Sequence, residues 1–434
     1  MLLVFCQKIT PRLDYVFKHV FETALGLTFS YTTTLDTFIA HAGPKMSYGK
    51  TPLGNEFFIE ATDLLFEQGI QEVDIKMNQW KGHPCFFEVG DKSKLPFDLF
   101  AASFYLITRY EEYLPHVKDA FGRYLAEQSL AHEKKFLQTP LVDHWIAAFY
   151  EELKASFPEL TVPKERKEKF LPLIEVVSPF KYSNKSFFSN VYQWCKSVFQ
   201  LNLWEIIEHP LVLLGLRNDP WNTFEEFTSL FYKMPFSLRF FFLFSKESYL
   251  DRGISTMNAS FQSLIKGVAD YFEVSLLASY PSRTVVKQLR NERNGLNALI
   301  HRSVNNIRFA WGVTTVDETY RSLLAEEVTA DFSLGYSMVF GYRASTAVPF
   351  LYYDLANEMS TPLMVYPVVA SENAFSEFTP VDVIRQLQQF EENLSLASAV
   401  HCFAISNKVL ENSKENEALR SVFISYLQAH DKKR

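Results

Sequence analysis

Short apolar segments alternate with longer amphipathic ones throughout the second half of the chain, and this alternation constrains the fold most. Seven segments have the apolar composition of buried strands, namely 173–177, 238–244, 274–277, 307–311, 332–338, 363–368 and 400–405. Helical periodicity follows them in 188–207, 224–232, 260–272, 284–305, 319–327, 381–394 and 416–429. The alternation predicts parallel strands joined by helices, hence a seven-stranded (β/α) barrel. A doubly wound open sheet would produce the same pattern.

The first part of the chain mixes short strands with helices and is long enough to form a domain of its own. Two domains are expected for 434 residues. The polar segment PELTVPKERKEKF, residues 158–170, is typical of a linker. We therefore expect a smaller N-terminal α/β domain over residues 1–157 and the barrel over 171–434, with amphipathic helices predicted at 97–116 and 140–157.

Composition and charge exclude several classes of protein. With 47% hydrophobic and 21% charged residues, the chain has a globular composition. The net charge of −7 and the absence of a basic run argue against nucleic-acid binding. No apolar run approaches the roughly 18 residues of a membrane span. The N-terminal MLLVFCQKITPRLDYVF lacks a basic region and a cleavage site, so it is typical of a first strand and not of a signal peptide.

Cofactor motifs are missing from the sequence. Neither GxGxxG nor GxxxxGK[ST] occurs, which disfavours nucleotide cofactors. No two of the ten histidines are spaced for a shared metal, and the nearest patterns are Glu205 with His209 and Asp143 beside His144. Helix-surface or interface roles are the plainer interpretation of both pairs. We therefore expect no cofactor and no metal site.

The four cysteines, Cys6, Cys85, Cys195 and Cys402, are far apart and form no CxxC pair. This spacing argues against a disulfide framework and favours a reduced, cytoplasmic setting. GxSxG is also absent, and Cys195 and Cys402 fit small core residues better than nucleophiles.

The segment FSLGYSMVFGYRASTAVPFLYYDL, residues 332–355, combines a strand-like stretch, Gly341, Tyr342, Arg343 and many aromatic residues. At a strand end of an α/β barrel, Arg343 would lie on the functional rim. It could anchor an acidic ligand there, or form a structural ion pair, and the residues alone leave both readings open.

These same residues carry a family resemblance. GYRASTAVPFLYYDL, FDLFAASFYLITRYEEYLP, GRYLAEQSLAHEKKFLQTPLVDHW and FQSLIKGVADYFEV resemble a long bacterial branch of the polysaccharide deacetylase family. The resemblance extends over residues 9–429 and is closer in the N-terminal segments. It implies an N-terminal α/β domain before a deacetylase-type barrel, and a role in cell-envelope polysaccharide metabolism.

The resemblance also implies that the catalytic site has degenerated. Active relatives use a divalent metal such as zinc, held by an aspartate and two histidines beside a catalytic base. The matching positions here hold Glu175, Val177, Leu277, Ala310 and Ser406. Deacetylation by this route needs a metal to polarise the acetyl group and a base beside it, and the single carboxylate of Glu175 cannot replace an aspartate and two histidine ligands.

Other matching positions keep polar or aromatic side chains. The resemblance places Glu175, Tyr280, Arg308, Tyr342 and Arg343 at strand ends, where they are candidate ligand-binding residues. The favoured reading is a pseudoenzyme that binds a polysaccharide or sugar, or acts as a scaffold for a protein partner or a second copy. The alternative is an active carbohydrate deacetylase with a rebuilt site, using Glu175, Tyr280, Arg343 and His401. A purely structural or oligomerisation role also fits.

Overall fold

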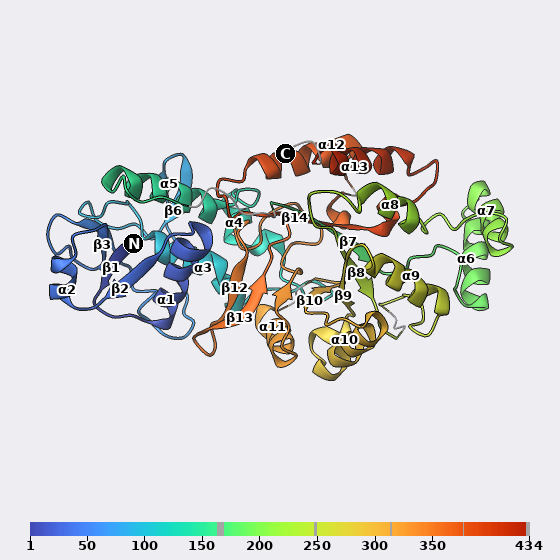
Figure 1. Ribbon diagram of the computed structural model, residues 1–434, viewed down its shortest axis with the longest axis horizontal. Helices are drawn as coiled ribbons and strands as arrows, with labels where there is room; N and C mark the ends of the chain where they lie inside the picture. Colours follow the sequence, from blue (N-terminus) through green and yellow to red (C-terminus); the bar gives the residue numbers. More distant parts are fainter. Residues whose placement is uncertain (163–168, 247–249, 313–314, 376, 431–434) are drawn as a thin grey trace.

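The structure is a computed structural model of the chain. It describes residues 1–162, 169–246, 250–312, 315–375 and 377–430. The molecule is elongated, with a small N-terminal sheet at one end, a larger sheet in the middle and a pair of protruding helices at the other end (Figure 1). None of the described helices is long and apolar enough to cross a membrane.

The N-terminal sheet is parallel and has the strand order β2-β1-β3-β4. Its strands are β1 (Leu2–Cys6), β2 (Phe29–Thr32), β3 (Lys45–Gly49) and β4 (Phe57–Glu60), and β5 (Met77–Trp80) pairs with β6 (His83–Phe86) in a separate hairpin. The helices of this half include α1 (Pro11–Phe17), α2 (Leu35–Ala40), α3 (Leu99–Ile107), α4 (Leu130–Glu133) and α5 (Leu141–Ser156). Every residue of β1 is buried, as expected for a strand covered by helices on both faces.

The larger sheet has eight strands in the order β12-β13-β11-β10-β9-β8-β7-β14. They are β7 (Phe170–Val176), β8 (Arg239–Leu243), β9 (Glu273–Ala278), β10 (Asn306–Phe309), β11 (Ala330–Asp331), β12 (Phe350–Asp354), β13 (Met359–Val365) and β14 (His401–Ser406). Their pairings are parallel except that of β12 with β13. The predicted mixed α/β fold with a large parallel sheet is therefore correct.

Helices connect these strands and lie on the outer side of the sheet (Figure 1). They are α6 (Phe187–Phe199), α7 (Leu203–Leu213), α8 (Phe224–Phe231), α9 (Ala259–Ala269), α10 (Val286–Ile300), α11 (Val316–Ala325), α12 (Pro380–Glu392) and α13 (Glu417–Ala429). Local capping sets their starts: the Asn258 side chain accepts the Phe261 N–H, and Thr379 caps α12 with Pro380 at its first position.

The large sheet curls, so that one face of its strands encloses a second core. This inner cluster comprises Leu171, Leu173, Phe241, Leu243, Leu277, Ala330, Phe332, Val368, Val400, Cys402 and Ala404. The rings of Phe241 on β8 and Phe332 just after β11 lie 5.5 Å apart, although β9 and β10 separate those strands in the sheet. Alternate strand residues such as Ile174 and Phe242 face the outer core instead.

The segment following β13 reaches β14. The Val369 N–H donates to Cys402 O at 2.9 Å, and the Ala404 N–H donates to Ala370 O at 2.9 Å. These bonds bring the two ends of the curled sheet together. Full closure as a seven-stranded barrel stays a prediction, because the regular ladders describe eight strands with β12 and β14 at the ends.

Three predicted elements differ from the structure. The single helix predicted over 97–116 ends as α3 at Ile107, because Arg109 has φ +55° and a 3-10 turn, Tyr110–Tyr113, follows it. The segment 332–338 is not a strand, because β11 ends at Asp331 and the backbone beyond it packs closely against Val368 instead of forming a ladder. The single helix predicted over 188–207 is broken, since Leu201 has φ +55° and separates α6 from α7. The sequence also did not identify β12.

One continuous hydrophobic core includes residues from both halves of the chain. The Tyr15 hydroxyl donates to Leu351 O at 2.8 Å, and Arg12 pairs with Glu358. The predicted linker, 158–170, lies partly outside the described residues, at 163–168. The division into domains at that point remains a prediction.

Candidate functional site

Glu175 and Arg308 form an ion pair across the inner face of the sheet. Glu175 belongs to β7 and Arg308 to β10, which β8 and β9 separate, and the Arg308 Nε donates to the Glu175 carboxylate. The side chains are 18% and 6% exposed. Arg308 also donates to the carbonyl oxygen of Phe332 and to the Ser371 hydroxyl, the latter at 3.0 Å. The carboxylate thus faces a cation that the sheet itself holds in place.

The remaining degenerate positions lie around this pair. Leu277 is fully buried in the inner cluster, and Val177 and Ala310 pack against that cluster. Ser406 lies opposite Glu175 in the parallel ladder of β14 and β7. The fold therefore gathers these five positions at the carboxyl ends of the strands, and three of them carry apolar side chains.

Tyr280 lies at the same end of the sheet, beneath a segment of the N-terminal half. Its N–H donates to the Asp251 carboxylate at 3.0 Å, and its hydroxyl donates to Phe121 O at 3.4 Å. The Trp311 Nε1 donates to Asp251 at 3.2 Å, and the rings of Phe121 and Trp311 stack 4.8 Å apart. Asp251 is buried. The N-terminal half thus contacts the region where the sequence predicted a rim.

The segment that carries Asp251 covers the neighbouring strand ends. A Cβ on Gly253 would lie 3.2 Å from the carbonyl oxygen of Val177 and 3.2 Å from the Leu243 side chain. Ile254 is buried. Close packing against the ends of β7 and β8 therefore fills space that an open site in this place would require.

Arg343 has a different partner from the one a rim site would need. Its Nε and Nη2 donate to the two carboxylate oxygens of Glu112 at 2.8 and 2.6 Å, and both side chains are almost completely buried. Arg109 donates to the same carboxylate at 2.7 Å. Burial raises the pKa of Glu112, but the charges of Arg343 and Arg109 outweigh it and lower the pKa to about 2.

Tyr342 is also buried, its hydroxyl directed at Phe390 O at 3.5 Å and its N–H bonded to Leu137 O. Of the two readings left open for Arg343, the structure supports the ion pair. Tyr342 and Arg343 contact the other half of the protein, whereas Glu175 and Arg308 contact each other.

The two pairs nearest to a metal pattern are held by other contacts. Glu205 accepts from the Ser197 hydroxyl at 2.8 Å, and His209 bonds Asn190 at 3.2 Å. The His144 ring stacks on His83 at 4.5 Å. Within the described ranges, no three His, Cys, Asp or Glu side chains are grouped as metal ligands would be.

Asp143 anchors α5 to the C-terminal half. It is fully buried and accepts from the Thr346 hydroxyl and, at 2.9 Å, from the Ala347 N–H. Burial raises the pKa of Asp143 to about 7, although these two bonds act in the opposite direction. The protonated form is therefore the one that the folded protein favours below neutral pH.

This raised pKa predicts a pH-dependent stability. Between pH 3.8 and about 7, the folded protein keeps the Asp143 proton that the unfolded chain releases. The stability that Asp143 contributes is therefore complete below pH 3.8 and is lost as the pH rises to 7. The free energy of unfolding of the wild type minus that of Asp143→Asn should fall by up to about 1.4 kcal/mol per pH unit. Urea unfolding at pH 5, 6 and 7 measures this difference. Both proteins contain His144, so its titration cancels in this difference. A difference in the free energy of unfolding that does not change with pH would contradict the prediction.

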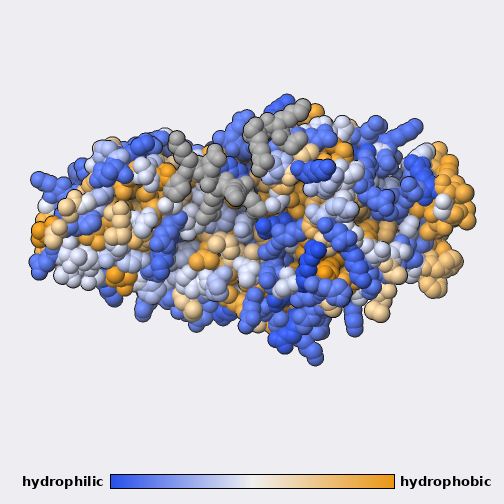
Figure 2. Space-filling model, in the orientation of Figure 1, coloured by the Kyte–Doolittle hydropathy of each residue, from blue (hydrophilic) through white to orange (hydrophobic). Residues whose placement is uncertain are grey.

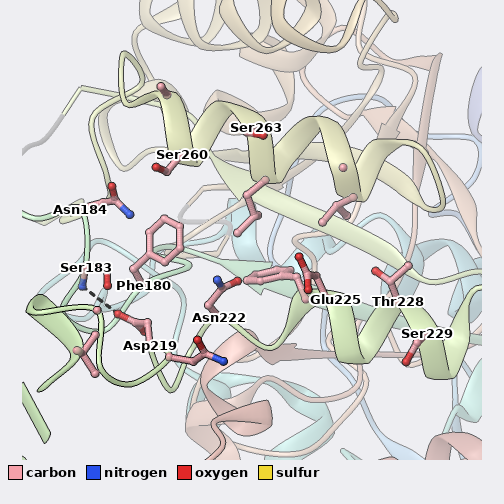
Figure 3. A pocket seen from close by; sticks show the side chains of 18 of the residues that line it. Phe180, Ser183, Asn184, Asp219, Asn222, Glu225, Thr228, Ser229, Ser260 and Ser263 are labelled. Atoms are coloured by element: carbon pink, nitrogen blue, oxygen red, sulfur yellow. Dashed lines mark hydrogen bonds between the residues drawn. The ribbon is translucent and has the colours of Figure 1, made fainter.

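A large open groove lies on the outer helix layer (Figure 3). Its volume is about 1270 Å³. Helices α8 and α9 form its walls, and the loops 180–184 and 215–222 close one end. Phe180, Asn222 and Glu225 project into the space between the two helices (Figure 3). The groove begins just beyond the carboxyl end of β7, outside the inner cluster.

Amides, hydroxyls and aromatic rings line this groove. The polar lining includes Ser183, Asn184, Asn218, Asp219, Asn222, Glu225, Thr228, Ser229, Ser260 and Ser263. Tyr232 and Tyr271, 46% and 58% exposed, meet edge to face at 5.9 Å between ring centres. Asp219 accepts the N–H groups of Tyr182 and Ser183 at 2.9 Å each, which fixes the loop at this end. Amide and hydroxyl groups beside aromatic rings suit a polar ligand with apolar faces, and Arg217, Asp219 and Glu225 add charged groups to the lining.

The sequence analysis did not find this groove. Its lining comes from four separate segments of ordinary polar residues, and no motif joins them. The abundance of Tyr and Phe was a signal for exposed rings, but composition does not tell which rings are exposed.

Comparison with known proteins identifies one family match. Residues 2–158 match the model of a family described as a family of unknown function, DUF7033. The match ends beside the predicted linker. No curated protein matches the chain.

Solved structures similar to the chain include members of the polysaccharide deacetylase family. One is a protein from Mycobacterium smegmatis described as a polysaccharide deacetylase (10% identity, TM-score 0.36, 63% of this chain and 88% of that one). A second is a mutant CE4 family pseudoenzyme with restored activity (8%, TM-score 0.28, 63% and 69%). A third is the 4-alpha-glucanotransferase of Thermococcus litoralis (9%, TM-score 0.38, 61% and 38%). At such identities and TM-scores the matches establish neither a shared fold nor a shared activity.

Proposed function

We propose that this chain is a deacetylase-like protein that binds carbohydrate without deacetylating it, in cell-envelope polysaccharide metabolism. The observation that carries the proposal is the ion pair of Glu175 with Arg308. A metal-activated water needs a free carboxylate and further ligands beside it. Here the only carboxylate among the five matching positions is paired, and Val177, Leu277 and Ala310 belong to the inner apolar cluster or pack against it.

The contacts of the four residues concerned weaken the alternative of a rebuilt hydrolase. That reading needs Glu175, Tyr280, Arg343 and His401 to converge on a substrate. Tyr280 bonds Phe121 and Asp251, while Arg343 is saturated by Glu112. His401 is buried in a cluster with Phe170 and Tyr426.

The groove between α8 and α9 is the proposed binding surface for a carbohydrate. Sugars present hydroxyl groups at their edges and C–H groups on their faces, which match amide and hydroxyl side chains beside exposed tyrosines. The proposal moves the ligand from the inner end of the sheet, where the sequence analysis placed it, to this outer groove.

Titration calorimetry with soluble, partly acetylated oligosaccharides tests the proposal. Tyr232→Ala and Tyr271→Ala should each weaken binding about 5- to 30-fold, since stacking on one ring contributes on the order of 1–2 kcal/mol. Phe378→Ala is the matched control, because Phe378 is 41% exposed but lies outside the groove. Its affinity should equal that of the wild type.

Two results would contradict the proposal. Equal affinities in all three variants would place the ligand elsewhere. Retention of a full equivalent of zinc after desalting, together with release of acetate from the oligosaccharides, would support the rebuilt hydrolase instead.

A further inference from the structure

Helices α6 and α7 bury polar residues and expose apolar ones, which is the reverse of ordinary surface helices. In α6 the buried residues are Asn190 and Ser197, whereas the buried residues of α7 include Glu208 and His209. A surface helix of a globular protein buries its apolar stripe and exposes its polar one. Here the two helices turn polar side chains toward each other and toward Lys181 and Tyr182 of the preceding loop.

Hydrogen bonds hold these polar faces in place. Asn190 bonds His209 at 3.2 Å, and the Tyr182 hydroxyl donates to Glu208 at 3.3 Å. The Ser197 hydroxyl donates to Glu205 at 2.8 Å. Rotating either helix to bury its apolar stripe would leave these groups without their partners, at a cost for each buried polar group.

The outward faces carry a dense apolar surface, here named the apolar tip. Of 29 exposed large apolar side chains in the described residues, 14 belong to the tip. They are Phe187, Phe188, Val191, Tyr192, Trp194, Val198, Phe199, Leu201, Leu203, Trp204, Ile207, Leu213, Leu214 and Leu216. Figure 2 shows apolar atoms gathered at the end of the molecule where Figure 1 places α6 and α7. So large an exposed patch marks an interaction surface.

The charges around the tip are unequally distributed. The carboxylates between residues 180 and 222 are Glu205, Glu208 and Asp219, and none of them is exposed. Glu205 is paired with Lys181 at 3.2 Å, and Glu208 with Arg217 at 3.4 Å. The exposed charge on α6 is a cation, Lys196. The tip therefore presents positive charge on a protein whose net charge is −7.

A pocket of about 480 Å³ adjoins the tip along α6. Among the described residues, its lining includes three cationic side chains, Lys185, Lys196 and Arg252, and no carboxylate. The remaining lining residues are Ser186, Ser189, Tyr192, Gln193 and Gly253. Tyr192 belongs both to this pocket and to the apolar tip, so an anion in the pocket would lie directly beside the apolar surface.

We propose that the apolar tip inserts into the headgroup layer of an anionic phospholipid bilayer, with a lipid phosphate in the Lys185–Lys196–Arg252 pocket. Exposed Trp and Tyr beside Lys side chains match the chemistry of a bilayer interface. An apolar surface bordered by cations is more complementary to an anionic membrane than to an uncharged patch on another protein. Helices of 13 and 11 residues are too short to span a bilayer, so they lie in its interface.

Vesicle co-sedimentation of the full chain tests this proposal. Wild-type protein should bind vesicles containing phosphatidylglycerol at least tenfold more strongly than pure phosphatidylcholine vesicles, with a loss of binding at high salt. The double variant Phe188→Glu/Phe199→Glu should bind at least tenfold less, because these side chains are 83% and 88% exposed. Lys196→Glu should reduce the preference for phosphatidylglycerol.

Ile39→Glu is the matched control. Ile39 is 63% exposed on α2, at the opposite end of the molecule, so its substitution should leave vesicle binding unchanged. Circular dichroism establishes that each variant is folded. A wild-type protein that ignores both vesicle types overturns the proposal. A wild-type dimer that the double variant converts to a monomer, without vesicle binding, assigns the tip to a second copy and overturns it too.

Discussion

Replacing Arg343 with methionine is expected to lower the free energy of unfolding by about 3–5 kcal/mol, because it leaves a buried carboxylate without its main partner. Glu112 and Arg343 are 3% and 2% exposed and share two hydrogen bonds. Arg109 remains beside Glu112, but it also contacts Glu111 at 2.7 Å. Urea unfolding followed by circular dichroism measures the loss. Arg343→Lys keeps the charge but cannot form the bidentate pair, so a smaller decrease in the free energy of unfolding is expected.

The matched control is Arg385→Met. Arg385 pairs with Asp382 on α12 at 2.6 Å, but its side chain is 70% exposed, so the same substitution should cost less than about 1 kcal/mol. The lowered pKa of Glu112 adds a pH signature. Stability from this group is present above pH 4.5 and is lost as pH falls toward 2, and Glu112→Gln should remove that dependence. Equal losses in Arg343→Met and Arg385→Met would contradict the structural role.

Replacing Gly335 with alanine is the second change with a large expected effect. A Cβ at this position would lie 2.4 Å from the backbone oxygen of Val368, which no rotation of a side chain relieves. The two segments are tied by a bond from the Val368 N–H to Leu334 O at 2.8 Å. Overpacking against backbone is expected to cost about 3 kcal/mol. Urea unfolding again measures the change.

Gly267→Ala is the control for this prediction. Gly267 lies inside α9, and an added Cβ there would meet nothing within 4 Å. Alanine should therefore raise the free energy of unfolding by about 0.5–1 kcal/mol through its helix preference. If Gly335→Ala is as stable as the wild type, the segments 332–338 and 366–371 are not packed as described.

The sequence predicted the parts of the fold that depend on local pattern. Short apolar runs identified β7, β8, β9, β10, β13 and β14 to within a few residues, because most strands of the large parallel sheet are buried on both faces. It failed at residues 332–338, whose composition is strand-like. Whether such a stretch joins a ladder depends on its neighbours, and here Gly335 brings it against Val368 instead.

For the candidate site, the five degenerate positions and Arg308 lie at one end of the large sheet, whereas Tyr342 and Arg343 contact the N-terminal half, and none of these partners was predictable. Glu175 and Arg308 are 133 residues apart, and Glu112 and Arg343 are 231 residues apart. Sequence spacing carries no information on contacts between such distant segments. The groove between α8 and α9 was equally hidden, since its lining residues have no shared motif.

The sequence by itself determined that strands and helices alternate, and that residues 188–207, which α6 and part of α7 occupy, have helical periodicity. Only the tertiary structure decided which face points outward. Bonds of Asn190 to His209 and of Ser197 to Glu205 join the polar faces of α6 and α7 to each other, and Tyr182 binds Glu208 from the preceding loop. The apolar faces are therefore left to solvent, because periodicity sets the faces of a helix but only its neighbours set its orientation.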